Sequence, residues 1–286
     1  MKRRAALAVI ASGISFAAKG RAEAAPDDAL ARLKQSGVMR IGVKSDLPAI
    51  AYVDTTQPGD LQGFEIDLAR GVAKRILGDP DRARLVGVTS ENRIPKLLSG
   101  EIDLILATMT ITPERLAQID FSNVYYKAGQ TLLVNPASKI RSYRDLAGHT
   151  VCTAQASTSA ATLARVAPAA RVVLRPTYGM CYDVLRDGGV DAMSTDDVIL
   201  LGFAFKDPKF TMLDERFTFE PYGIGLRKNS ASLKSAVNDA FKSIRRDGDY
   251  DSSYQRWFRQ PLPRGYGYWL DMDPALAAKK FADQSR

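Results

Sequence analysis

The chain has 286 residues, 45% of them hydrophobic and 25% charged, and its formal net charge is +8. This composition is ordinary for a soluble globular protein of one large or two smaller domains, and it excludes a disordered, collagen-like or disulfide-dense chain. Half of the net charge lies in the first 24 residues, where five basic residues accompany one acidic residue. The remaining excess is small and evenly spread, so the charge gives no indication of nucleic-acid binding.

The first 24 residues have the pattern of a cleaved export signal. Basic residues at positions 2–4 precede an uncharged stretch at 5–18, and Ala22 and Ala24 supply the small residues that a signal peptidase needs. The alternatives are an uncleaved anchor and a mitochondrial presequence, but the apolar stretch is shorter than the roughly 20 residues that span a bilayer. We therefore expect residues 1–24 to be a signal peptide.

Predicted strands and helices alternate along the remaining chain. Apolar and β-branched runs predict strands at residues 38–43, 84–88, 102–106, 130–134, 150–153, 172–174, 190–193, 210–213 and 223–226. Apolar residues at helical spacing predict helices at residues 64–77, 94–99, 158–166, 182–186, 197–205, 232–246, 250–258 and 274–281. This order predicts an α/β fold, with parallel sheets covered by helices on both faces.

Two segments 88 residues apart repeat one pattern. Residues 98–103 and 186–191 each combine a helix end, a glycine and an apolar residue followed by Asp, and a strand then leads to Thr108 or to Asp196. We interpret the repeat as two lobes of similar build, each presenting the carboxyl end of a strand to a shared cleft, where α/β sheets bind their ligands. The alternative is a coincidence between two common strand patterns.

Polar side chains follow the buried strand of the first half. Thr108, Thr110 and Arg115 lie within eight residues after it. Hydroxyl groups can bind a carboxylate or an ammonium, and Arg can hold a carboxylate through two parallel hydrogen bonds. The alternative is a helix start capped by Thr112, with Arg115 as a solvated charge.

A second group of candidates is basic. Ser90 and Arg93 stand where a helix opens after a predicted strand, and helix starts favour anions. Lys44 follows the first strand and adds a positive charge. The alternative for this group is a serine cap with two surface cations.

The second half offers matching positions. Ser157 and Thr158 separate a strand from a helix, so either can cap the helix while its N–H groups bind a carboxylate. Asp196 and Asp197 follow the repeated strand; one is expected to be an N-cap, and Asp196, by the register of the repeat, to face the cleft and bind an ammonium. The alternative is that both only cap the helix.

The two cysteines, Cys152 and Cys181, are expected to form a disulfide, because an even pair in an exported chain is usually bridged. The alternative is two buried free thiols. His149 is the only histidine and no Cys/His cluster accompanies it, so neither a metal site nor a cofactor is predicted.

Several of these motifs occur in the same order in one known family. The motifs span residues 63–69, 98–103, 108–115, 120–122, 190–192 and 222–228. With them the chain resembles a periplasmic solute-binding protein of the ABC transporters for polar amino acids. Within that class it is most similar to glutamate/aspartate-binding proteins, through residues 88–95 and 195–197 and the two cysteines.

The resemblance implies a type II periplasmic binding protein fold, in which two Rossmann-like α/β lobes are joined by two hinge strands and close on the ligand. The first lobe would comprise residues 27–128 and 223–286, and the second residues 129–222. It also implies a monomer that works in the periplasm and delivers an amino acid to a membrane ABC permease.

The resemblance further implies a role for each candidate. The ligand's α-carboxylate would be held by Arg115, Thr110 and the turn at Ser157 and Thr158. Its α-ammonium would be held by Thr108 and Asp196. A side-chain carboxylate would be held by Ser90, Arg93 and Lys44, with a further contact from Tyr178. One departure is visible, because the family usually has glycine where this chain has Ala156.

Charge agrees with these roles. Three cations, Lys44, Arg93 and Arg115, would meet one acid, Asp196. A basic ligand would add unpaired like charge, and a neutral amide would leave Arg93 without a charged partner. The expected ligand is therefore L-glutamate or L-aspartate, with glutamine and asparagine as weaker candidates.

Two rival functions use the same scaffold. The first is an enzyme of the prephenate or arogenate dehydratase type, but we find no catalytic Ser/His/Asp or Cys/His set, and His149 lies at a predicted surface turn. The second is a sensor whose closed form signals to a membrane receptor, which no sequence feature excludes.

Overall fold

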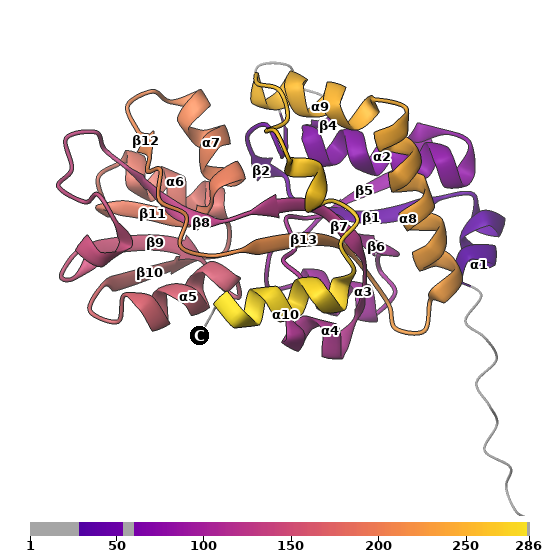
Figure 1. The fold of residues 1–286 in the computed structure, drawn as a ribbon, viewed down its shortest axis with the longest axis horizontal. Coiled ribbons are helices and arrows are strands. Elements are labelled where there is room, and N and C mark those ends of the chain that lie inside the picture. The colour runs from indigo at the N-terminus through magenta and orange to yellow at the C-terminus, as the bar shows by residue number, and fades with distance from the viewer. Residues whose placement is uncertain (1–28, 54–59, 285–286) are drawn as a thin grey trace, which may run out of the picture.

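The computed structural model describes residues 29–53 and 60–284, and the predicted signal peptide lies outside them. Two five-stranded sheets stand side by side, each covered by helices, with a small three-stranded sheet beside the first (Figure 1). None of the helices within the described residues is long and apolar enough to cross a membrane.

The first sheet has the order β5-β1-β6-β13-β7. Its strands are β1 (Met39–Val43), β5 (Ala83–Gly87), β6 (Leu104–Ile105), β7 (Asp120–Ala128) and β13 (Glu220–Leu226). Strand β1 is parallel to β5 and β6, whereas β13 is antiparallel to β6 and β7. The prediction of purely parallel sheets is wrong here. The chain leaves the first sheet along β7 and returns along β13, so these two strands must run in opposite directions.

The second sheet has the order β10-β9-β11-β8-β12. Its strands are β8 (Gln130–Val134), β9 (Thr150–Ala154), β10 (Arg171–Arg175), β11 (Ala192–Asp196) and β12 (Thr211–Met212). Strands β10, β9 and β11 are parallel, and β8 is antiparallel to its neighbours β11 and β12. Both sheets are therefore mixed. Because β8 follows β7 after Gly129 alone, no crossover helix is available to turn it parallel to β11.

The helices agree closely with the sequence pattern. They are α1 (Ala29–Ser36), α2 (Phe64–Leu77), α3 (Arg93–Leu98), α4 (Pro113–Gln118), α5 (Thr158–Val166), α6 (Tyr178–Arg186), α7 (Asp197–Lys206), α8 (Ala231–Arg246), α9 (Asp249–Phe258) and α10 (Pro274–Gln284). Helix α6 begins four residues before its predicted start because the side chain of Thr177 caps it, accepting a hydrogen bond from the Met180 N–H. Helix α1, strand β7 and the small sheet (Asp46–Leu47, Ala51–Val53, Leu61–Gln62) were not among the predicted elements. Helix α4 confirms the alternative of a helix start capped by Thr112, whose side chain accepts the Arg115 N–H.

Helix α2 illustrates why the pattern works. Leu68, Ala69 and Val72 recur at helical spacing and are fully buried, so each side chain removes its apolar surface from water. A buried leucine or valine stabilises the fold by about 1.5–3 kcal/mol. Gly78 ends the helix with φ 84°, a left-handed conformation that glycine adopts without strain.

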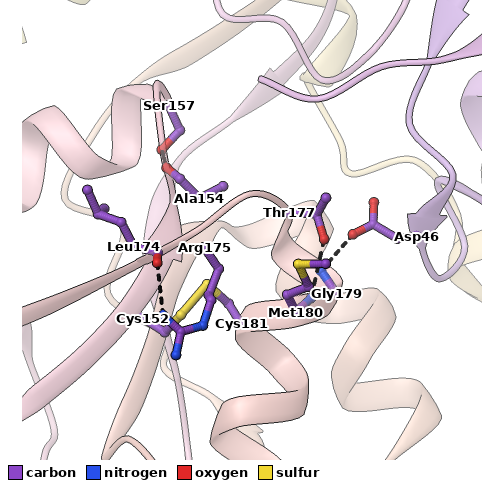
Figure 2. Close-up of a disulfide and its surroundings, with 10 residues drawn as sticks. All are labelled: Asp46, Cys152, Ala154, Ser157, Leu174, Arg175, Thr177, Gly179, Met180 and Cys181. Carbon is purple, nitrogen blue, oxygen red and sulfur yellow. Dashed lines mark hydrogen bonds between the residues drawn. A yellow bond between two sulfur atoms is a disulfide. The ribbon is translucent and has the colours of Figure 1, made fainter. Parts of the chain in front are cut away.

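The disulfide between Cys152 and Cys181 is confirmed, with a Cα–Cα distance of 5.4 Å. It joins β9 to α6 within the second sheet's layer (Figure 2). Gly179 donates its backbone N–H to the carboxylate of Asp46 in the small sheet, at 2.7 Å. The disulfide therefore anchors a helix whose first turn touches the first sheet's side of the molecule.

The C-terminal segment lies along the outer edge of β7. The backbones of Val124 and residues 271–272 exchange two hydrogen bonds, and the Tyr266 hydroxyl donates to the Lys127 carbonyl while accepting the Lys127 N–H. The Trp269 ring packs 5.2 Å from that of Phe219, just before β13. Helix α10 then runs beneath the sheet towards α5 (Figure 1). The segment thus covers both strands that connect the sheets.

Candidate ligand-binding site

The two halves of the molecule meet through hydrogen bonds between side chains. Gln155 of the second half donates to Glu91 of the first at 2.6 Å, and the bond from α6 to Asp46 crosses the same boundary. Thr158 donates to Glu220 at 3.0 Å. These bonds hold the halves together around a group of buried charged residues at the carboxyl ends of the strands.

Three of the buried groups are cations. Lys44 and Arg93 are each only 3% exposed, and Arg115 is partly buried. The Lys44 Nζ donates to Ser90 at 3.0 Å and lies 5.8 Å from the Tyr178 ring centroid. Arg93 donates to the carbonyls of residues 107 and 108, at 2.6 and 3.3 Å, while its Nε has no partner. In the part of the chain that the structure describes, Lys44 and Arg93 therefore donate hydrogen bonds to neutral groups only.

Burial makes these charges costly. Desolvation lowers the pKa of Lys44 to about 7, helped by repulsion from Arg93. Desolvation and repulsion from Arg115 lower the pKa of Arg93 to about 9. Burial also lowers the pKa of Arg115, although the Glu220 carboxylate opposes the shift. An anionic or strongly polar ligand would relieve this repulsion.

Three buried carboxylates accompany the cations, where sequence reasoning identified one. Asp196 is 3% exposed and accepts a hydrogen bond from the Tyr222 hydroxyl, leaving Oδ1 without a partner. Glu65 and Glu220 are almost completely buried and were not predicted as site residues. Glu65 stands in the first turn of α2 and Glu220 opens β13, and neither position carries a sequence signal that separates it from a structural acid.

Glu65 supports the backbone at the end of β6. Its Oε1 accepts the Thr108 N–H at 2.8 Å and the Tyr125 hydroxyl, and its Oε2 has no partner. Thr108 has φ 46°, a left-handed conformation that costs an L-residue roughly 1–2 kcal/mol. The hydrogen bond that the Thr108 N–H donates to Glu65 stabilises this strained residue. Burial raises the pKa of Glu65 to about 7.

Glu220 joins the two halves. Its Oε2 accepts hydrogen bonds from the Thr110 hydroxyl at 2.7 Å and from the Thr158 hydroxyl at 3.0 Å, whereas Oε1 has no partner. Burial raises the pKa of Glu220, and the threonine hydroxyls and Arg115 oppose the shift. Burial and the nearby Glu220 charge also raise the pKa of Asp196.

The start of α5 is built as a capped turn. The Ser157 hydroxyl accepts the Ala160 N–H at 3.1 Å and donates to the Ala154 carbonyl at 2.6 Å, so it caps the helix. Ala156 has φ 55°, in the region where glycine is unstrained. The departure noted in the sequence therefore falls on a position that favours glycine.

The two aspartates at α7 differ from the expectation that Asp197 is the N-cap, because Asp196 stands at the N-cap position and Asp197 is the first helical residue. Asp196 makes no side-chain cap bond and faces Tyr222. Asp197 accepts the N–H groups of Val198 and Gly129 and pairs with Arg216 at 3.0 Å.

All ten candidate residues belong to one connected network of hydrogen bonds and electrostatic contacts. They are Lys44, Ser90, Arg93, Thr108, Thr110, Arg115, Ser157, Thr158, Tyr178 and Asp196. Their individual contacts with a ligand remain predictions. His149, by contrast, is exposed and pairs with Asp191 at 3.4 Å. Within the described residues, no group of three His, Cys, Asp or Glu side chains is placed to hold a metal ion.

A cavity of about 710 Å³ adjoins the network between α3, α4 and α5. Its polar wall includes Ser90, Arg115 and Thr158, and its apolar wall includes Ile94 and Phe281, the latter from α10. Of the ten candidates, Ser90, Arg115, Ser157 and Thr158 line this cavity, whereas the other six and the two additional carboxylates, Glu65 and Glu220, are not part of its lining.

Comparison with known proteins defines the class. Residues 39–260 match the family of bacterial extracellular solute-binding proteins, family 3, and the chain belongs to this family. The fold is that of the type II periplasmic binding proteins: the cysteine-binding protein from Campylobacter jejuni superposes with a TM-score of 0.76 at 29% identity, over 82% of this chain and 95% of that one.

Among its relatives, a glutamine-binding protein of Geobacillus stearothermophilus is 45% identical over 77% of this chain and 85% of its own. The ABC transporter glutamine-binding protein GlnH of Bacillus subtilis is 40% identical over 82% and 85%. The glutamate-binding protein GluB of Corynebacterium efficiens is 30% identical over 89% and 88%. The chain is thus an amino-acid-binding protein of the ABC-transporter class.

Proposed function

We propose that this protein captures L-glutamine outside the cytoplasm and presents it to the membrane permease of an ABC importer. The observation that carries the proposal is that four of the eight buried side-chain polar atoms without partners in the described residues lie in the charged cluster. They are Glu65 Oε2, Arg93 Nε, Asp196 Oδ1 and Glu220 Oε1. Buried polar groups are almost always hydrogen-bonded, so acceptors and a donor left open together indicate the place of a zwitterionic ligand.

The charge balance favours a neutral amino acid. The sequence predicts three basic groups and one acid in the site, and the structure adds Glu65 and Glu220, so the cluster holds three basic and three acidic groups. A glutamine zwitterion preserves this balance, and glutamate would add an uncompensated negative charge. The higher identity of the two glutamine-binding relatives supports the same preference.

The side-chain end of the site suits an amide. The amide oxygen would accept hydrogen bonds from Arg93, Lys44 or Ser90, and the amide N–H₂ would donate to the open Oε2 of Glu65. A ligand carboxylate could accept hydrogen bonds from Arg93, Lys44 or Ser90. It has no N–H to donate to Glu65, so it could bond to Glu65 only if one of the two carboxyl groups were protonated. Tyr178 would contact the same end from the second half.

Glutamate is the second candidate, for one specific reason. Lys44 and Arg93 repel each other and neither is paired with a carboxylate within the described residues, which favours a ligand with a second negative charge.

In this proposal the lobes are residues 27–128 with 223–286, and residues 129–222. They close about β7 and β13 when ligand binds. The signal peptide at 1–24, the periplasmic location and the monomeric state belong to the same proposal.

Isothermal titration of the mature protein with glutamine, glutamate, aspartate, asparagine and arginine tests it. We expect glutamine to bind most tightly, with glutamate weaker by about tenfold or more, because one unpaired buried charge costs over 1.4 kcal/mol. Binding of basic or apolar amino acids alone would refute the proposal. Release of an aromatic product from prephenate would support the enzyme instead.

A further inference from the structure

We infer that Glu220 binds the ligand's α-ammonium through its open Oε1 and orients the hydroxyls of Thr110 and Thr158 through Oε2. The inference rests on the proposed amino-acid-binding function. It also reverses the role that family resemblance gives to these two threonines, namely binding the α-carboxylate.

The argument starts from proton accounting. A threonine hydroxyl has one proton to donate and two lone pairs with which to accept. Thr110 and Thr158 both direct that proton to Oε2 of Glu220, at 2.7 and 3.0 Å. Neither has a second proton for a ligand carboxylate. Each keeps a lone pair that can accept a hydrogen bond from an ammonium.

The third hydroxyl assigned to the α-carboxylate is committed in the same way. Ser157 donates its proton to the Ala154 carbonyl and accepts the Ala160 N–H. The carboxylate is therefore left with the guanidinium of Arg115 and the backbone N–H groups at the start of α5, which are suitable donors to an anion.

The open acceptors lie where an ammonium is needed. Glu220 Oε1 and Asp196 Oδ1 are both buried without a partner. The Glu220 charge raises the pKa of Asp196, and Arg115 attracts both carboxylates. An α-ammonium has three N–H groups, and these two oxygens with the Thr110 hydroxyl supply three acceptors.

Glu220 lies on one of the two strands that connect the sheets. It is the first residue of β13, which carries the chain from the second sheet to the first, while Thr110 and Thr158 come from opposite halves. One carboxylate thus sets the hydroxyl direction on both walls of the cleft at the point where they hinge. The carboxylate that binds the ammonium would thus also link the two walls through hydrogen bonds.

Glu220→Gln tests the inference because it removes the charge and keeps the shape. Titration measures the dissociation constants of the wild type and the variant for L-glutamine and for glutaramic acid, which is glutamine without the α-amino group. Where binding is weak, thermal shift at millimolar ligand replaces titration. We expect glutamine to lose roughly 10- to 100-fold, and glutaramic acid to change by less than about twofold. Glu220→Asp should restore part of the glutamine affinity. Glu101→Gln, which removes an exposed carboxylate outside the cluster, is the matched control.

Equal weakening of both ligands, with the fold intact, would overturn the inference and leave Glu220 as a structural bridge between the lobes. No loss for either ligand would overturn it as well. If Glu220→Gln does not fold, Thr110→Val replaces it. This variant removes the Thr110 hydroxyl as an acceptor for the ammonium, so it should weaken glutamine and leave glutaramic acid nearly unchanged. If wild type binds glutamate and not glutamine, the proposed ligand is wrong, and glutamate with glutaric acid replaces the pair.

Discussion

The two ends of the charged cluster are built differently. At one end, Asp196 and Glu220 are bonded to hydroxyl groups, and residues from both halves and from β13 take part. At the other end, Lys44, Arg93 and Glu65 all come from the first half. An amino acid bound between them would present the groups common to all amino acids to the first end and its side chain to the second. We call the end with Asp196 and Glu220 the backbone end, and the end with Lys44, Arg93 and Glu65 the side-chain end. The backbone end should control closure, and the side-chain end should control specificity.

The largest expected effect is at the backbone end. Arg115→Ala should abolish binding of every amino acid, because it removes the main donor to the α-carboxylate and leaves two buried carboxylates uncompensated, a loss of about 3–5 kcal/mol. Titration with glutamine and asparagine measures it. Retention of either ligand would show that the backbone end does not hold the carboxylate.

The next effect separates the two ends. Arg93→Ala should weaken glutamate more than glutamine, and both by about tenfold or more, because a charged hydrogen bond contributes about 1.5–3 kcal/mol. Alanine, which has no polar side chain, should change by less than about twofold if it binds the wild type. Equal losses for all three ligands would break the division between the ends.

Glu65→Gln sharpens the specificity argument. The substitution removes the open acceptor and adds a donor, so it should shift the ratio of glutamine to glutamate affinity towards glutamate by about tenfold. Glu91→Gln, at the edge of the cleft, is the matched control and should leave the ratio unchanged. A ratio that does not respond to Glu65→Gln would remove Glu65 from the ligand contacts.

The same end should respond to pH. Lys44 and Glu65 both have pKa values of about 7, lowered and raised respectively by burial. As pH rises through 7 each tends to lose a proton, so the side-chain end becomes more negative and the preference for glutamine over glutamate should increase. Titrations on either side of pH 7 measure this ratio. A preference that falls with pH would contradict the assignment.

The ligand-free protein should show the linked stability change. Glu65 binds its proton more tightly when folded, so its contribution to the free energy of unfolding falls as pH rises from 4.5 to about 7. Lys44 binds its proton less tightly when folded, so its contribution rises between about 7 and 10.5. Both contributions should disappear in the double variant Lys44→Met with Glu65→Gln, as measured by urea unfolding.

The smallest effect concerns the turn before α5. Ala156→Gly should stabilise the protein by about 0.5–1 kcal/mol, because it relieves a left-handed alanine at some cost in chain entropy. Chemical unfolding measures the change. Destabilisation by glycine would show that the alanine side chain makes a compensating contact.

The sequence predicted much of this architecture because local patterns encode it. The spacing of Leu68, Ala69 and Val72 predicted α2, whereas α6 begins earlier than predicted because Thr177 caps it. The cysteine pair predicted the disulfide. Boundaries set by pairing with distant strands, such as the early start of β13, have no local signal.

The second and third carboxylates were beyond sequence reasoning for a physical reason. Glu65 lies in the first turn of a helix, where acids are expected as partners of the helix dipole. Glu220 precedes proline at the start of a strand and has no helical or strand pattern of its own. Only the fold shows that both are buried beside Arg93 and Arg115. The prediction of an acidic ligand rested on three cations and one acid in the site. It therefore depended on the omission of Glu65 and Glu220.

The most direct test is the structure of the protein crystallised with L-glutamine. The account predicts the α-ammonium against Asp196 and Glu220, the α-carboxylate on Arg115, and the amide between Arg93 and Glu65. A ligand whose α-carboxylate contacts the hydroxyls of Thr110 and Thr158 would contradict the arrangement of the backbone end. A ligand that touches none of these charged side chains would contradict the whole assignment.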